Sequence, residues 1–294
     1  MTAAETTARS ISADQTAEPA HSIKPRRMGF DMSQLSEKYF YRNNSILSTL
    51  FYALSASFPD GERFFIDSVR YYQKGIDDPA LQAQIRGFIG QEAHHGRIHE
   101  EFNERAQSLG IAMDKIVPRF QNRVNMARRR LTHGQQLAVT AALEHITATL
   151  AQWTLENPEA GLGEDSSNSP LREMLIWHAM EEIEHKSVAF DVYRAAVNDE
   201  KQRIVVAKMV FRSFWMQMAI AQVVLLWNDR KLPSWREIRG AWQFMWGDNG
   251  FRRWAQPEFK KYLVPGFHPT DIDQSHLLSQ WHETYPEVAA LQVA

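Results

Sequence analysis

Apolar residues recur at helical spacing along most of the chain after Asn44, whereas the alternation typical of strands is scarce. Pro79, which follows two aspartates, suits the first turn of a long helix, and Gly110 marks its end. A second long helix is predicted over 169–198, where a serine N-cap precedes a proline at the first helical position. The pattern therefore predicts an all-α protein.

Two further helices complete a set of four. Residues 134–157 have helical periodicity throughout, and residues 59–74 form another helix that joins 45–57 through a kink at Pro59. Residues 158–168, which begin with proline and include two glycines, are the clearest loop. Four long amphipathic helices with polar groups on their core faces are what a metal-holding bundle needs. We therefore expect a four-helix bundle core with additional C-terminal helices.

The two ends of this pattern define the expected domains. Residues 1–27 are rich in Ala, Thr, Ser and Glu without periodicity, which predicts a flexible N-terminal leader. The leader contains no apolar run that could serve as the h-region of a secretory signal, so we expect a cytoplasmic protein. Residues 28–294 are expected to form a single all-helical domain that binds metal, for the reasons that follow.

The composition narrows the chemistry. The 33 Lys and Arg balance 35 Asp and Glu to a formal charge of -2, which gives no net attraction to a polyanion, so nucleic acid is not an expected partner. The chain contains no cysteine, which excludes disulfides, thiolate metal ligands, iron–sulfur clusters and a cysteine nucleophile. Any metal must therefore bind to oxygen and to imidazole nitrogen.

The segment 203–227 is the most apolar part of the chain. Residues 213–228 carry no formal charge, but this run is shorter than the roughly 20 residues that a membrane-spanning helix requires. We expect a buried helix, in the core or at the subunit interface of a homodimer, with shallow membrane contact as the alternative. All nine tryptophans lie after residue 150. They indicate the aromatic wall of a pocket or a dimer contact in the C-terminal half.

Chemistry-bearing residues interrupt the apolar stripe of the helix that begins at Pro79. The stripe gives way to Glu92, His95 and His99, which fall within about 60° of one another on a helical wheel. The first two of these residues form a Glu-x-x-His unit. Charged groups thus stand where core residues are expected.

The helix over 169–198 repeats this arrangement. Its apolar stripe gives way to His178, Glu181, Glu182 and His185, and apolar residues then resume. A buried carboxylate without a partner costs several kcal/mol, and no Lys or Arg shares either stripe, so a bound cation is the simplest solution. Carboxylate plus imidazole suits Fe(II), Mn(II) or Zn(II), and two facing Glu-x-x-His units suit a pair of metals.

Each of the two remaining helices offers one glutamate to such a pair. Glu144 is flanked on its helix face by small and apolar residues, and Glu62 lies within FPDGERFF. Alone, either residue would more often be a helix-end acid or a member of an ion pair than a metal ligand. The order Glu, Glu-x-x-His, Glu, Glu-x-x-His on four helices predicts that both are ligands.

Some assignments stay open at this point. His99 and His178 lie one turn from the expected ligands and are either additional metal ligands or supports for them. Glu181 competes with Glu182 for the same role. Glu184 points further round the helix and is expected to be solvated or paired.

The chain resembles the bacterial proteins catalogued as predicted metal-dependent hydrolases, which are similar to the ferritin-like di-iron carboxylate superfamily. The resemblance implies a ferritin-like four-helix bundle core that holds a dinuclear metal site, and it includes His99 and His178 in its motifs. The matching segments are RRMGFDMS (26–33), FPDGERFF (58–65), FIGQEAHHGRIHEEFN (88–103), WHAMEEIEHKSVAFDVY (177–193) and PGFHP (265–269).

Our leading functional hypothesis is a di-iron carboxylate enzyme, an oxygenase or oxidase. It would activate O2 for hydroxylation, desaturation or related oxygenation of a hydrophobic small molecule, with electrons from a donor protein. Two Fe ions are expected, with Mn or Zn as substitutes. The expected ligands are Glu92 and Glu182 as bridging, catalytic carboxylates, His95 and His185 as one imidazole for each metal, and Glu62 and Glu144 as terminal ligands.

Two alternatives remain at the level of the sequence. The first is a metal-dependent hydrolase that uses a metal-bound hydroxide, with two metals clamping the oxygen of the scissile group. The second is a non-catalytic iron-binding bundle. The aromatic C-terminal extension argues against the second, because storage of iron needs no organic pocket.

Overall fold

The computed structural model describes residues 23–162 and 170–284, and within these ranges the protein is helical without a strand. The prediction of an all-α fold is therefore confirmed. Two short 3-10 helices, Met32–Gln34 and Pro269–Asp271, accompany the α-helices. The α-helices are α1 (Ser45–Gln73), α2 (Pro79–Ser108), α3 (Met113–Arg130), α4 (His133–Glu156), α5 (Pro158–Gly161), α6 (Pro170–His185), α7 (Val188–Ala196), α8 (Glu200–Asn228), α9 (Trp235–Trp246), α10 (Phe251–Tyr262) and α11 (Ser275–Thr284).

The starts and stops of the first long helices follow local chemistry. The Asn44 side chain accepts hydrogen bonds from the first turn of α1, and the Asp78 side chain does the same for α2. Gly110, at φ +83°, follows the end of α2 as expected. The segments expected on either side of Pro59 form one continuous helix, α1, which contains the proline.

The helix predicted over 169–198 is divided. It begins within the described residues at Pro170, ends at His185, and resumes as α7 from Val188 to Ala196. At the break, Lys186 Nζ donates to Ile272 O at 2.5 Å and to Gln274 Oε1 at 2.6 Å, so the chain turns where this lysine contacts the C-terminal segment. The expected N-cap at residue 169 lies outside the described residues.

Two predicted irregular segments also differ. The loop expected over 158–168 begins with the short helix α5, and its part after 162 lies outside the described residues. Most of the leader expected over 1–27, residues 1–22, lies outside the described residues, and Ile23 and Arg26 in its described part are buried. Arg26 is 6% exposed and pairs with two carboxylates, which fixes this end of the segment against the bundle.

The candidate ligands lie in a polar layer between two apolar clusters. Along α2, Phe88 belongs to one cluster and Ile98 to the other, and Glu92 and His95 lie between them. The candidate ligands of α1 and of the α6–α7 pair likewise lie near the boundary between the two clusters. The fold thus surrounds the polar layer with hydrophobic packing at both ends, which keeps bulk water from it.

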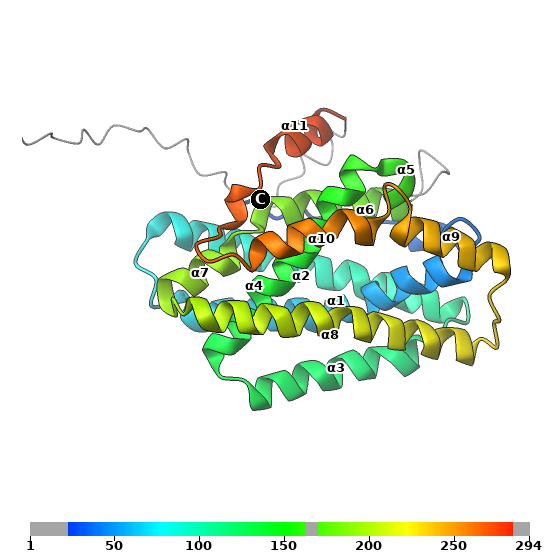
Figure 1. Ribbon diagram of the computed structural model, residues 1–294, viewed down its shortest axis with the longest axis horizontal. Coiled ribbons are helices and arrows are strands. Elements are labelled where there is room, and N and C mark those ends of the chain that lie inside the picture. Colours follow the sequence, from blue (N-terminus) through cyan, green and yellow to red (C-terminus); the bar gives the residue numbers. More distant parts are fainter. Residues whose placement is uncertain (1–22, 163–169, 285–294) are drawn as a thin grey trace, which may run out of the picture.

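Helix α8 covers this bundle from one side. In Figure 1 it crosses the front of the molecule with α3 below it and α10 above it, and α9 lies at the right-hand end. α8 is the one described helix long and apolar enough to cross a membrane by length and composition, but only 22% of its most apolar window is buried. The expectation of a helix buried in the core is therefore wrong for its outer face. The expected homodimer stays a prediction.

Candidate metal centre

Six predicted ligands converge at the centre of the bundle. α1 contributes Glu62, α2 contributes Glu92 and His95, α4 contributes Glu144, and α6 contributes Glu182 and His185. All six side chains are buried, and none of the residues is more than 4% exposed. The spacing of each Glu-x-x-His unit places its two side chains on one helix face, which aims both at the same space.

Glu92 belongs to two candidate binding positions. At one position its carboxylate lies close to Glu144 and His185. At the other it lies close to His95 and Glu182. Within each group the ligand atoms lie within 4.8 Å of one another. This arrangement suits a carboxylate that bridges two cations.

The donor atoms themselves test whether a metal fits. Both carboxylate oxygens of Glu62, Glu92 and Glu144 are buried without a hydrogen-bond partner. His95 Nδ1 and His185 Nε2 are likewise buried without a hydrogen-bond partner. His185 Nε2 lies 3.1 to 3.4 Å from oxygens of three glutamates, but none of these contacts has hydrogen-bond geometry. Unsatisfied oxygens and imidazole nitrogens that face one space are what divalent cations bind, so the residues fit a metal.

Burial and mutual repulsion shift the pKa values of the acids in the cluster. Burial and the neighbouring carboxylates raise the pKa of Glu92 to about 8 and that of Glu62 well above its ordinary value. Burial likewise raises the pKa of Glu144 to about 7. Burial opposes ionisation of Glu182 as well, but the hydrogen bond with His178 and the close approach of His185 hold its pKa well below the usual range. Without a cation, the cluster therefore retains protons that a metal would displace.

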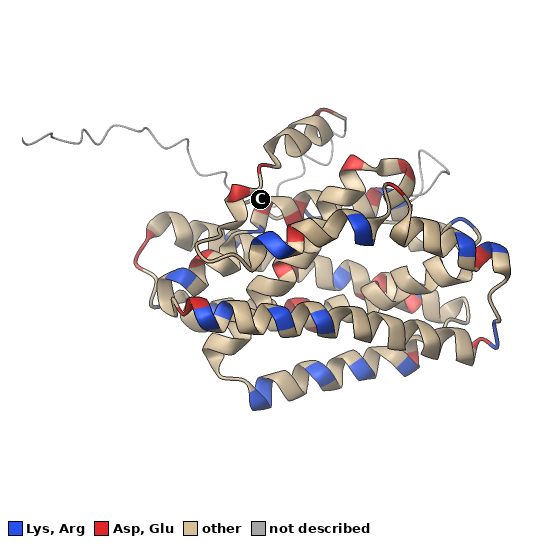
Figure 2. Cartoon of the chain, in the orientation of Figure 1, with Lys and Arg blue, Asp and Glu red and all other residues tan. Residues whose placement is uncertain are grey.

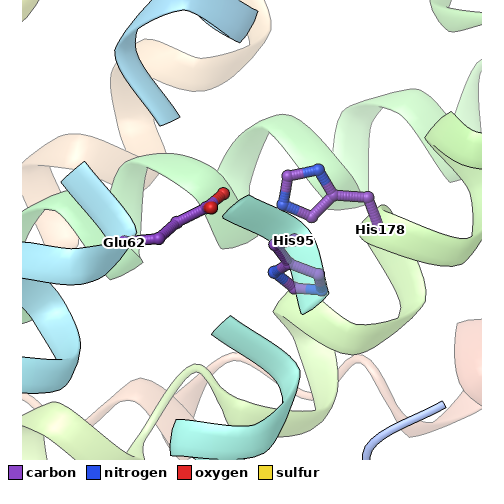
Figure 3. A group of neighbouring side chains, drawn as sticks. All are labelled: Glu62, His95 and His178. Atoms are coloured by element: carbon purple, nitrogen blue, oxygen red, sulfur yellow. The ribbon is translucent and has the colours of Figure 1, made fainter. Parts of the chain in front are cut away.

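His99 and His178 are occupied differently from the six. Figure 3 shows Glu62, His95 and His178 directed toward one another from α1, α2 and α6. His178 already uses both ring nitrogens, with Nε2 at 2.8 Å from Glu182 Oε1 and Nδ1 at 2.9 Å from His99 Nε2. His99 Nδ1 in turn lies 2.9 Å from Ser55 Oγ. Hydrogen bonding therefore favours a supporting role for both histidines, and not direct ligation.

Asn103 sets the direction of this hydrogen-bond chain. Its amide nitrogen donates to Ser55 O, so its oxygen accepts from Ser55 Oγ at 2.7 Å. Ser55 Oγ must then accept from His99 Nδ1, and His99 Nε2 must accept from His178 Nδ1. His178 Nε2 lies 2.8 Å from Glu182 Oε1, so this chain of hydrogen bonds ends at a candidate metal ligand.

Sequence reasoning missed Arg26, which connects the outer nitrogens of both candidate histidine ligands. On one side its Nη1 donates to Glu181 Oε1 at 3.2 Å, and Glu181 Oε2 lies 3.0 Å from His95 Nε2. Glu181 therefore orients the His95 ring with Nδ1 toward the centre, while its own oxygens contact Arg26 and His95.

On the other side the connection runs through two residues. Arg26 holds Glu184, Gln91 Nε2 donates to Glu184 Oε2 at 2.8 Å, and Gln91 Oε1 lies 2.9 Å from His185 Nδ1. Nδ1 therefore donates outward and Nε2 faces the acids. Burial opposes ionisation of Glu184, but His282, Arg26 and Gln91 together lower its pKa to about 2. RRMGFDMS contains Arg26 and FIGQEAHH contains Gln91, so both lay inside motifs already noted, but helical periodicity gave no signal for a residue outside the helices.

Two glycines of α2 make room for the segment that carries Arg26. A Cβ at Gly87 would lie 2.3 Å from Ile23 O, and one at Gly90 would lie 2.2 Å from Pro25 Cγ. Such distances are too short for any side chain, so the extended segment lies directly on the helix backbone. This close approach delivers Arg26 to Glu181 and its neighbours.

An apolar cavity of about 110 Å³ reaches the centre from one side. His99, His178 and Glu182 form its polar wall. Its other lining residues are almost all apolar and include Leu50, Phe51, Leu54, Phe58, Leu171, Leu175, Trp215 and Phe244. A ligand in this cavity would therefore lie in an apolar environment with one polar end at Glu182.

The fold and the centre define an all-helical protein with a buried carboxylate and histidine cluster suited to metal. A family model described as predicted metal-dependent hydrolase matches residues 24–273, so the chain belongs to that family. No curated protein and no solved structure gives a significant match.

The family corrects our leading functional hypothesis. Its description indicates a metal-dependent enzyme that hydrolyses its substrate, which overturns the O2-activating oxygenase and supports the hydrolase considered as an alternative. The family and the buried Glu and His groups support a metal without singling out iron. O2 and the electron-donor protein were expected from the oxygenase hypothesis alone and are withdrawn with it.

Proposed function

We propose that this protein is a metal-dependent hydrolase that cleaves an ester or amide bond in a hydrophobic small molecule. The observation that carries the proposal is the set of unpartnered ligand atoms of this centre, together with an apolar cavity that reaches Glu182, another of its candidate ligands. Membership of the hydrolase family supports the reaction type.

The proposed metal ligands are the six residues that converge. Glu92 would be shared between two cations, with Glu144 and His185 on one side and His95 and Glu182 on the other. Glu62, whose oxygens have no partner, would complete the set. Divalent cations held there supply a water of lowered pKa and polarise the oxygen of the scissile bond.

The cavity would select and orient the substrate. Its apolar walls favour an acyl chain or ring over a charged group, because burial of apolar surface contributes about 25 cal/mol per Å². Leu175 on α6 and Phe58 on α1 line the cavity together with His178, so a bound chain would place its carbonyl end near that histidine. The same walls exclude bulk water from the reacting end.

His178 would donate a proton to the leaving group. The hydrogen-bond chain from Asn103 makes Nδ1 of His178 the donor to His99, and Nε2 lies 2.8 Å from Glu182 Oε1 at the wall of the cavity. A general acid at hydrogen-bond distance contributes about 10²- to 10⁴-fold to such reactions. His99 and Ser55 would keep the ring in this orientation.

The test is hydrolysis by metal-loaded protein. Metal-free protein is loaded in turn with Zn(II), Mn(II) and Fe(II) and assayed with 4-nitrophenyl esters and anilides from acetyl to dodecanoyl chains. We expect cleavage that needs metal and favours the longer chains. Glu92→Ala should abolish it, and Glu104→Ala, an exposed residue of the same helix, should not. Protein that binds metal but cleaves no member of the panel would refute the proposal.

A further inference from the structure

The end of the molecule that carries α9 exposes an unusual number of large apolar side chains. Trp227 at the end of α8 is 82% exposed, Leu232 in the following loop is 90% exposed, and Trp235 at the start of α9 is 79% exposed. We define the tryptophan patch as these three residues together with Ile238, Trp242 and Trp246.

The patch lies on the outer face of a firmly anchored helix. The α9 members recur at spacings of three and four residues, which places them on one side of the helix. The inner side of α9 carries Ala241 and Glu237, both buried. Glu237 Oε1 accepts from Ser45 N at 2.9 Å, which ties α9 to the first turn of α1. The exposure of the tryptophans therefore belongs to a fixed surface, and not to a loosely attached helix.

Between residues 227 and 246, basic residues outnumber acids, and both acids are engaged. Figure 2 shows Lys and Arg gathered around α9 and the loop that precedes it. The basic residues are Arg230, Lys231, Arg236 and Arg239. The only acids from 227 to 246 are Asp229, which pairs with Lys38, and the buried Glu237. The surface therefore presents aromatic side chains and positive charge together.

A basic pocket of about 620 Å³ adjoins the patch. Lys231, Arg236 and Arg239 line it, and so do Trp153 and Phe244. The last two residues also line the apolar cavity that reaches the candidate metal centre. Trp153 and Phe244 thus separate the positively charged pocket from the apolar cavity.

We propose that the tryptophan patch docks on the surface of an anionic lipid bilayer, with α9 lying in the interface. Tryptophan is enriched at the boundary between headgroups and acyl chains, and arginine and lysine beside it pair with anionic headgroups. A second copy of this chain fits less well, because a two-fold contact through the patch would bring the same arginines face to face. The proposal stands independently of the hydrolase reaction.

The experiment is flotation of the full chain with lipid vesicles. One set of vesicles is phosphatidylcholine alone, and the other is an equal mixture of phosphatidylcholine and phosphatidylglycerol. We expect binding to the mixed vesicles, weakened by added salt and accompanied by a blue shift of tryptophan emission. Arg236→Gln with Arg239→Gln should weaken binding by roughly fivefold for each charge removed. Trp235→Ala with Trp242→Ala should reduce it at least as much.

Matched variants distinguish the patch from general stickiness. Tyr71→Ala removes an exposed aromatic side chain from α1, and Arg129→Gln with Arg130→Gln removes two charges from α3. We expect both controls to bind like the unmodified protein. Equal losses in the control and patch variants, or no binding to mixed vesicles at low salt, would overturn the proposal. A dimer in light scattering that Trp242→Ala converts to monomer would also overturn it, since a second copy would then cover the patch.

Discussion

Arg26 holds the carboxylate of Glu184 with both ends of its guanidinium group. Nη1 lies 2.8 Å from Oε2, and Nη2 lies 2.6 Å from Oε1. Nη1 also reaches Glu181, so one arginine from an extended segment supports the carboxylates behind both candidate histidine ligands. Burial opposes its charge, but these partners raise the pKa of Arg26 above its ordinary value. The orientation of the two imidazoles thus depends on a residue that contacts neither of them.

This relationship predicts a loss of metal affinity when Arg26 is replaced. Arg26→Met leaves Glu181 and Glu184 buried without their cation, which we expect to destabilise folding by about 3–5 kcal/mol. The affinity for Zn(II) should fall by about 10- to 100-fold, because the outer partners of His95 and His185 are no longer fixed. Isothermal titration with metal and urea unfolding measure the two effects.

Two variants control this prediction. Arg26→Lys keeps the charge but loses the two-pronged geometry, so its metal affinity should fall between those of the unmodified protein and Arg26→Met. Arg27→Met changes the exposed neighbour and should have no effect on either measurement. Unchanged metal affinity in Arg26→Met would show that the two imidazoles hold their orientation without it.

His95 and His99 lie one turn apart on α2 and are predicted to respond differently to the same substitution. His95 Nδ1 has no hydrogen-bond partner, whereas both nitrogens of His99 are engaged. His95→Gln should therefore lose at least one metal per chain, and His99→Gln should keep the full content while hydrolysis falls. Elemental analysis after dialysis makes the comparison. Loss of metal in His99→Gln would instead identify that residue as a ligand.

The sequence was sufficient for the fold class and for the composition of the centre. Helical periodicity identified α2 and α4 nearly to their ends, and the aspartates before Pro79 correctly marked the start of α2, where Asp78 caps the helix. Acids and histidines in place of core residues gave the six residues that the structure brings together. Both inferences rest on local spacing, which a single chain displays directly.

The parts that could not be predicted depend on contacts between distant segments. The break after His185 coincides with a contact of Lys186 to residues 272–274, which no local pattern announces. Arg26 reaches Glu184 across 158 positions of sequence, and the glycines that admit its segment read in sequence as ordinary helix interruptions. The exposure of the outer face of α8 could likewise not be predicted, because hydrophobicity alone does not distinguish a buried apolar stripe from one on the surface.

Metal stoichiometry should separate Glu92 from Glu144. Glu92 takes part in both candidate positions and Glu144 in one. We therefore expect Glu92→Ala to weaken the binding of both metals and Glu144→Ala to remove one while the other remains. Elemental analysis and competition with a chelator give the two stoichiometries. The same loss in both variants would mean that Glu92 is not shared.

The metal-free protein should become less stable as pH rises above neutrality. Burial raises the pKa of Glu92 to about 8 and that of Glu144 to about 7, so the folded state holds protons that unfolded carboxyls release near 4.5. The stability that these two groups contribute is fully present below the pKa of an unfolded carboxyl. It is lost as the pH rises through the pKa values that the groups have in the folded protein. The loss between about pH 6 and about pH 8.5 should be on the order of 4 kcal/mol.

Urea unfolding at the two pH values measures this loss. Glu92→Gln combined with Glu144→Gln should flatten the dependence, because neither amide titrates. Added Zn(II) should remove it by binding the ionised carboxylates. A metal-free protein that gains stability over this interval would contradict the prediction.

Narrowing the cavity should change substrate preference without changing metal content. Leu175 lies one turn before His178 on α6, is partly exposed, and lines the cavity that reaches Glu182. Leu175→Trp would fill space beside the proposed proton donor, so KM for a dodecanoyl ester should rise by about tenfold or more while that for an acetyl ester stays nearly constant, since each buried CH₂ contributes about 0.8 kcal/mol. Leu232→Trp, in the exposed loop before α9, is the matched control and should leave both values unchanged. Equal effects of Leu175→Trp on both esters would show that the acyl chain binds elsewhere.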